Sequence, residues 1–147
     1  MSFHHDGTDA ETVLRVIPAI EVDQRQRVGN GSGPGAAVGV GGNVAYRHFN
    51  GIVSAISEQH PLLGKYVHRY FDDIKRHLQS LRKVVTPKAR CFYIVGNSKF
   101  YDTMLPVEEI YAALFEDAGF RNVGWKAIRK RNSKKELFEF VVHAVAP

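Results

Sequence analysis

The residues best suited to chemistry lie in one hexapeptide, Gly96-Asn97-Ser98-Lys99-Phe100-Tyr101, which directly follows a short apolar segment. Glycine lets a backbone approach a ligand closely, the polar side chains supply hydrogen-bonding groups, and the aromatic rings offer stacking faces. This combination suits a ligand with polar edges and flat rings. The alternative interpretation is a polar strand-to-helix loop that only turns the chain.

A second candidate site is a cluster of positive charge near the C-terminal end of the sequence. It contains Arg121, Lys126, Arg129, Lys130, Arg131, Lys134 and Lys135. If this segment faces DNA, Arg129, Lys130 and Arg131 neutralise phosphates and give salt-dependent, sequence-independent affinity. A solvated hairpin whose charges keep a sheet edge soluble is the other interpretation.

The residue types give little support to metal or thiol chemistry. The chain has one cysteine, Cys91, and no His-x-x-x-His pattern, so we expect no metal site. Cys91 begins an apolar segment and is expected to be a core residue rather than a nucleophile. A single cysteine also excludes an internal disulfide, which favours a reducing, cytoplasmic location.

The segments around the hexapeptide have the hydrophobic patterns of helices and a buried strand. Apolar residues at three- and four-residue steps predict a long helix over about 65–85, after a weaker helical pattern that Pro61 interrupts. The continuous apolar run 90–95 predicts a strand covered on both faces. A further helix is expected over about 107–118, with Gly119 just past its end.

Two more strands are expected to close the chain as an antiparallel hairpin. Residues 123–128 alternate in polarity, residues 137–145 are apolar at most positions, and the basic turn 129–135 separates them. The resulting order is helix, strand, helix, antiparallel hairpin. It predicts an α/β fold, part of a three-layer Rossmann-like sheet, which binds ligands at the carboxyl ends of its strands, where the hexapeptide begins.

The first part of the chain differs in composition from the rest. Seven of the 13 glycines lie in residues 29–42, which offer few side chains that could pack and are typical of a linker. Thr12–Val22 is a candidate strand within this region. We therefore expect a flexible or peripheral N-terminal segment over residues 1–42, and a domain over residues 43–147.

Length and charge limit the class of protein. The 147 residues are 44% hydrophobic and 24% charged, which is typical of one globular domain and excludes wholesale disorder. The net charge of +5 favours an acidic partner such as nucleic acid over a cationic substrate. No apolar run reaches the roughly 20 residues of a spanning helix, and the N-terminus lacks a secretory pattern, so we expect no membrane partner.

Three segments between Tyr66 and Val145 are together similar to one enzyme family. They are YFDDIKRHLQSLRKVVTPKARCFYIVGNSKF, PVEEIYAALFEDAGF and IRKRNSKKELFEFVV. This span resembles the C-terminal half of an S-adenosylmethionine-dependent DNA methylase of the adenine-N6 and cytosine-N4 class. In that family a long helix precedes the fifth strand, which ends in a Gly-(Asn/Asp)-Ser-like turn. The next helix ends at a Gly-Phe pair, here Gly119-Phe120, and an antiparallel hairpin closes the sheet.

The resemblance implies methyl transfer from S-adenosylmethionine to an exocyclic amine of a DNA base. It implies that Gly96, Asn97 and Ser98 line the floor of the catalytic cleft. Lys99, Phe100 and Tyr101 then face the base or the DNA backbone, and Arg129–Arg131 hold phosphate.

The catalytic part of that family is missing from this sequence. Its signature, (Asp/Asn/Ser)-Pro-Pro-(Tyr/Phe/Trp), holds the target amine and stacks on the flipped base, but all six prolines here are isolated. Catalytic residues are therefore not assigned. The cofactor-binding half is missing as well, because no clear buried strand leads into the glycine-rich stretch 39–42, which we interpret as linker. That half would need on the order of 100 further residues.

We therefore expect a chain that is inactive alone. It binds S-adenosylmethionine only when a missing half or a second polypeptide completes the fold. A truncated product and one half of a split enzyme both agree with the sequence. The alternative, from a different class, is a non-enzymatic nucleic-acid-binding module that uses the basic hairpin 121–135.

Overall fold

The computed structural model describes residues 12–14, 43–131 and 136–147. These residues form β1 (Thr12–Leu14), α1 (Phe49–Gln59), α2 (Pro61–Val84), β2 (Arg90–Gly96), β3 (Ser98–Phe100), β4 (Thr103–Leu105), α3 (Val107–Asp117), β5 (Arg121–Lys130) and β6 (Phe138–Val145). The protein is mixed α/β, and a helix, a strand, a helix and a hairpin follow one another as predicted. Most of the segment that we expected to be flexible, residues 1–42, lies outside the described residues.

The main sheet has four strands in the order β1-β2-β6-β5. β1 runs parallel to β2, whereas β6 is antiparallel to both of its neighbours, β2 and β5. Residues 12–14 of the N-terminal segment thus take part in the main sheet. A separate hairpin, β3-β4, follows β2 directly. The sheet is therefore mostly antiparallel in the described part of the chain.

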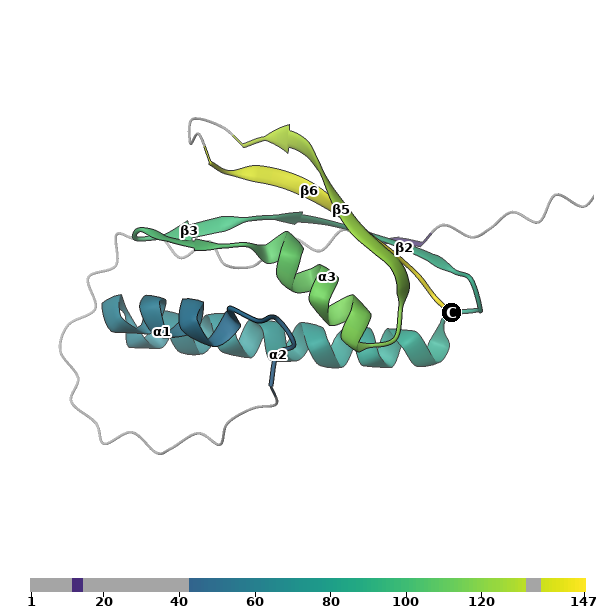
Figure 1. Ribbon diagram of the computed structural model, residues 1–147, viewed down its shortest axis with the longest axis horizontal. Helices are drawn as coiled ribbons and strands as arrows, with labels where there is room; N and C mark the ends of the chain where they lie inside the picture. The colour runs from purple at the N-terminus through teal and green to yellow at the C-terminus, as the bar shows by residue number, and fades with distance from the viewer. Residues whose placement is uncertain (1–11, 15–42, 132–135) are drawn as a thin grey trace, which may run out of the picture.

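All three described helices lie on the same side of the main sheet (Figure 1). α3 packs against β2, β5 and β6, while α1 and α2 pack on each other. The sequence predicted that β2 is covered on both faces. Among the described residues, helices cover only one face, so the expected third layer is not seen there.

α2 begins several residues earlier than its apolar stripe predicts. Pro61 follows the end of α1 at Gln59, as predicted, but it also lies in the first turn of α2, where the N–H that proline lacks has no partner in any helix. His60 caps this end, since its Nδ1 accepts a hydrogen bond from the Leu63 N–H at 3.1 Å. The predicted stripe is confirmed, because Val67, Phe71 and Leu78 are fully buried.

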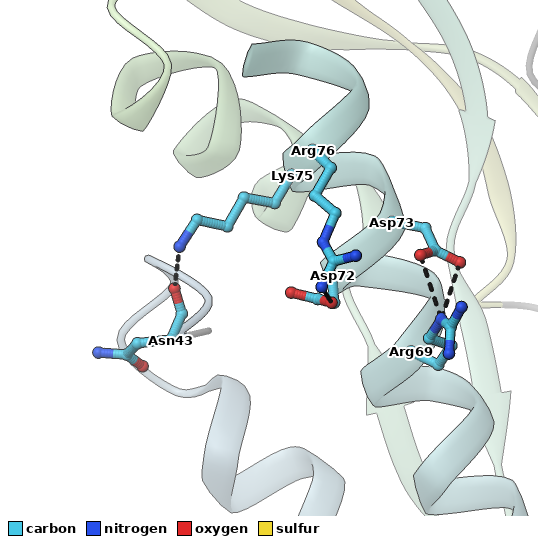
Figure 2. A network of polar contacts seen from close by, with 6 residues as sticks. All are labelled: Asn43, Arg69, Asp72, Asp73, Lys75 and Arg76. Atoms are coloured by element: carbon cyan, nitrogen blue, oxygen red, sulfur yellow. Dashed lines mark hydrogen bonds and ion pairs between the residues drawn. The ribbon is translucent and has the colours of Figure 1, made fainter. Parts of the chain in front are cut away.

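Polar contacts link residues of α2 to one another and to the segment before α1 (Figure 2). They are Arg69–Asp73 at 3.1 Å, Asp72–Arg76 at 3.0 Å, and Lys75 Nζ to the carbonyl oxygen of Asn43 at 2.7 Å. The Arg69–Asp73 pair is exposed and contributes little to stability, whereas the carboxylate of Asp72 is buried and Arg76 provides its counter-charge. The contact with Asn43 matters more for the fold, because it ties the segment before α1 to α2.

Two glycines are required by the packing and the helix ends. A Cβ atom at Gly64 of α2 would lie 1.8 Å from Ser57 Oγ of α1, so glycine allows the two helices to approach. Gly119 follows α3 with φ +92°. Its N–H and that of Phe120 donate to carbonyl oxygens in the last turn at 3.0 and 3.1 Å, which ends α3 as the sequence predicts.

The core lies between the helices and the covered face of the sheet. Tyr93, Tyr111 and Phe115 are fully buried, and the Tyr93 and Phe115 rings meet edge to face with centroids 5.2 Å apart. Cys91 is buried beside them, as expected, and this burial raises the pKa of its thiol. A thiol in this state is a poor nucleophile at neutral pH.

Candidate nucleic-acid interface

The predicted site residues gather at one end of the main sheet. The carboxyl end of β2, the β3-β4 hairpin, the end of β5 and the start of β6 lie together there (Figure 1). Two contacts join them directly. Lys99 Nζ lies 2.7 Å from Glu136 Oε2, and Arg131 Nη1 donates to the Asn97 carbonyl oxygen at 3.2 Å. The hexapeptide and the Arg129–Arg131 end of the basic cluster, which are distant in sequence, thus form one surface. Arg121 lies at the other end of β5, and Lys134 and Lys135 lie outside the described residues.

Asn97 is a buried side chain that joins two strands. Its Oδ1 accepts a hydrogen bond from the Phe138 N–H at 2.8 Å, and its Nδ2 donates to the Glu136 carbonyl oxygen at 3.0 Å. Both ends of the amide are therefore engaged with the start of β6. Asn97 fixes the shape of the surface, and its side chain has little capacity left for a ligand.

Gly96 is covered by the basic cluster rather than open to a ligand. A Cβ atom added there would lie 2.9 Å from Arg131 Nη1, so the guanidinium occupies the space next to the glycine. Glycine at this position therefore makes room for Arg131. Ser98 follows at the start of β3 and is half-buried.

The segment after Asn97 is a hairpin rather than the loop that the sequence predicted. Phe100 is buried within the core, so its ring is not available for stacking on a base. Tyr101 is 51% exposed at the turn of this hairpin. Its φ of +53° is rare for a residue with a bulky side chain, and such strain persists mostly at functional positions. Of the two predicted stacking rings, only Tyr101 can meet a ligand.

The predicted phosphate-binding cations are partly neutralised within the chain. Arg129 forms a bidentate contact with Glu139 at 2.6 and 2.8 Å, and this carboxylate raises the pKa of the guanidinium. Glu136 likewise raises the pKa of Lys99. Lys130 is exposed and makes no ion pair with a described residue. A phosphate must therefore compete with carboxylates at two of these positions, and the bidentate contact of Arg129 with the half-buried Glu139 is the stronger competitor.

A buried carboxyl group at the start of α3 escaped the sequence analysis. Glu108 is 7% exposed, and its Oε2 has no hydrogen-bond partner among the described residues. Burial raises the pKa of this carboxyl to about 7. The neighbouring Glu109 is different, because its Oε2 accepts a hydrogen bond from the Tyr46 hydroxyl at 2.5 Å. The only feature of the sequence that could have indicated the burial of Glu108 is helical spacing, because Glu108 shares a helix face with the fully buried Phe115.

The described residues do not fit S-adenosylmethionine on their own. The space at Gly96 is filled by Arg131, and the amide of Asn97 is already used. The glycine-rich stretch 29–42 lies outside the described residues. No step of a methyl transfer can therefore be derived from this chain alone.

No protein-family model, curated protein or solved structure matches this chain. Within the described residues, no group of three or more His, Cys, Asp or Glu side chains could hold a metal ion. None of the described helices is both long and apolar enough to cross a membrane.

Proposed function

We propose that this chain forms the C-terminal part of an S-adenosylmethionine-dependent DNA methyltransferase, and that a second polypeptide supplies the cofactor-binding half. The order of elements around β2 carries the proposal. A long helix, α2, precedes β2, which ends at Gly96-Asn97-Ser98. α3 then ends at Gly119-Phe120. The antiparallel pair β5-β6 follows, and β6 pairs with β2. The resemblance implies this order.

The position of β1 supports the same proposal. It runs parallel to β2 at the edge of the sheet and precedes the long helix, as the fourth strand of a Rossmann-like methyltransferase sheet does. The catalytic tetrapeptide of the family follows that strand. Here the residues after β1 are Arg15-Val16-Ile17-Pro18, which contain neither a Pro-Pro pair nor an aromatic residue. The tetrapeptide would therefore have to come from the second polypeptide, and this chain is expected to be inactive alone.

DNA would meet the surface formed by the two hairpins. Tyr101 offers an exposed ring for stacking, and Lys130 offers an exposed charge for a phosphate. Lys99, Arg129 and Arg131 lie on the same surface. They can bind phosphates when their contacts with Glu136, Glu139 and the Asn97 carbonyl oxygen break. Gly96, Asn97 and Ser98 hold the strand end beneath them.

A tritium-transfer assay with labelled S-adenosylmethionine and DNA tests the proposal. The purified chain is expected to transfer no label above background. Adding a polypeptide encoded in a neighbouring reading frame, with a Pro-Pro-aromatic tetrapeptide and a glycine-rich turn, is expected to restore transfer. The matched control is that polypeptide with its tetrapeptide replaced by alanines. Robust turnover by the chain alone would refute the division of the enzyme into two parts.

A nucleic-acid-binding module is the second candidate, favoured by the exposed cation and ring at the hairpin ends. It predicts DNA binding that weakens with salt and is lost when Arg129, Lys130 and Arg131 are changed to glutamine. A variant with the same change in charge elsewhere, at Lys65, Lys83 and Lys88, controls for net charge. DNA binding without any heat of binding for S-adenosylmethionine, with or without the second polypeptide, would favour the module.

A further inference from the structure

The face of the main sheet that is turned away from the helices, here called the outer face, carries an apolar strip at its centre. The register pairs Ile94 with Val141 and Phe92 with His143, and residues that face each other across a ladder share one face of the sheet. Phe92, Ile94, Val141 and Val145 are all half-buried, and none belongs to the core cluster. Their neighbours Tyr93 and Val142 point to the opposite, covered face and are fully buried.

Leaving this apolar strip exposed to water is unfavourable in free energy unless another segment or molecule covers it. Antiparallel sheets that face water on one side alternate apolar and polar residues, whereas β2 is apolar on both faces. Among the described residues, no helix covers the outer face (Figure 1). The continuous apolar run in β2 is therefore explained only by a contact that lies beyond the described residues.

Positive charge borders the apolar strip along β5. Lys126 lies opposite Val141 and Arg121 lies opposite Val145 in the ladder, so both are placed on the outer face. Both side chains are exposed and make no ion pair with a described residue. Arg131 lies at the far end of the same face, over Gly96. A ligand that fits this surface is apolar along its middle and acidic along its edge.

The charge and the composition decide among the candidate occupants. A second copy of the chain, stacked face to face about a two-fold axis, would bring strongly basic faces together, and each copy carries a net charge of +5. The chain's own residues 29–42 contain seven glycines and no aromatic residue, so they offer few side chains that could fill the strip. Residues 15–28 contain apolar side chains but also Arg15, Arg25 and Arg27, whose positive charge matches that of Arg121 and Lys126 rather than complementing it. An amphipathic helix from another polypeptide can cover the apolar strip with its apolar stripe and pair with the basic edge through acidic flanks.

We propose that the outer face, formed by Phe92, Ile94, Val141 and Val145 and bordered by Arg121 and Lys126, binds an amphipathic helix with acidic flanks on a second polypeptide. If the proposed function is right, this helix belongs to the cofactor-binding half, and the outer face is where that half attaches. This part of the inference rests on the proposed function. Arg131 lies at the border of both surfaces, but Tyr101 and Lys130 are not part of the outer face, and Phe92, Ile94 and Val141 are not part of the DNA-facing surface, so the two can be tested separately.

Two designed peptides test the docking surface with the full chain. Each is an amphipathic helix of about 18 residues with a leucine stripe, and the flanks carry glutamates in one and lysines in the other. Binding is measured by isothermal titration, and the contact is mapped by amide chemical shifts. The acidic peptide is expected to bind at least about tenfold more tightly at low salt and to shift amides of β2 and β6. Equal binding of the two peptides, or binding of neither, would overturn the proposal.

Variants of the surface provide the second arm of the test. Changing Phe92, Ile94 and Val141 to threonine keeps strand-forming residues but removes the strip, and it is expected to abolish peptide binding without lowering the melting temperature. A lower melting temperature together with no binding by the unchanged chain would mean that the face is already covered within the chain, and the proposal would fail. Arg121→Glu with Lys126→Glu is expected to reverse the preference toward the lysine-flanked peptide.

The outcomes separate this proposal from the others. Retained peptide binding without restored methyl transfer would leave the docking surface standing and refute the methyltransferase assignment. If the threonine variant loses DNA binding, the face is a nucleic-acid platform and the docking proposal is overturned. A dimer of the chain in sedimentation that the threonine variant dissolves would make the occupant a second copy, which also contradicts it.

Discussion

Replacing the buried Glu108 with glutamine is expected to make the protein more stable at pH 8 but not at pH 4.5. The folded protein raises the pKa of this carboxyl from 4.5 to about 7, chiefly because burial disfavours the charged form. Its own backbone N–H opposes this rise, and the charge of Glu109 adds to it. Glutamine has nearly the same shape and no charge, so the variant removes the ionisation and little else.

The sign and size of the effect follow from linkage. Below pH 4.5 the carboxyl is protonated in both the folded and the unfolded chain, so it contributes no pH dependence. Between pH 4.5 and about 7 the unfolded chain loses the proton while the folded chain keeps it, so stability falls as the pH rises. The full difference in pKa corresponds to about 3 kcal/mol, and screening by nearby water reduces the expected loss to about 2 kcal/mol.

Urea unfolding at pH 4.5 and pH 8, followed by far-ultraviolet circular dichroism at fixed ionic strength, measures this loss. The free energy of unfolding of Glu108→Gln minus that of the unchanged protein is expected to be near zero at the lower pH and about 2 kcal/mol at the higher one. Glu116→Gln is the matched control, because Glu116 is exposed on the same helix. Comparing differences between variants cancels the titration of the histidines. Equal pH dependence in the Glu108 variant and the unchanged protein would refute the argument from burial.

Four further substitutions test the fold and the surface. Gly64→Ala is expected to destabilise the protein by about 1–3 kcal/mol through overpacking between α1 and α2. Gly51→Ala, at a position with open space around it, is expected to stabilise the protein. Thermal melts compare the two variants, and equal effects would contradict the close contact between Gly64 and Ser57. Asn97→Ala is expected to cost about 1–3 kcal/mol in urea unfolding, because the Phe138 N–H loses its acceptor. Tyr101→Asn is expected to stabilise the hairpin by relieving its positive φ while weakening DNA binding in a titration; unchanged binding would remove Tyr101 from the interface.

Local patterns in the sequence were enough to place the elements around β2. The steps of three and four residues that place Val67, Phe71 and Leu78 on one side of a helix predicted α2, and the spacing to Gly119 predicted where α3 ends. Such signals depend on residues close in the chain. The first turn of α2 was missed because proline breaks a helix interior but suits its first turn, and the difference depends on where the helix starts.

The candidate site could be predicted as a set of residues but not as an arrangement. Sequence analysis selected Lys99, Arg129 and Arg131 by their charge. It could not show that Lys99 lies against Glu136, or that Arg131 fills the space at Gly96, because these contacts join segments far apart in the chain. The same limit applied to Phe100. From the sequence its ring could stack on a ligand or pack in the core, and the β3-β4 hairpin places it in the core.

The sequence by itself determined which segments are helical or extended, which of them carry apolar faces, and that the chain is basic. These properties follow from periodicity and composition, which are local. Only the tertiary structure decided that β6 lies between β2 and β5, that the two hairpins meet at one end of the sheet, and that Glu108 is buried. Strand order and burial depend on pairings between distant residues, and the energy of a charge depends on what surrounds it. The apolar run of β2 predicted a cover on both faces, and the structure showed which of the two faces the described helices cover.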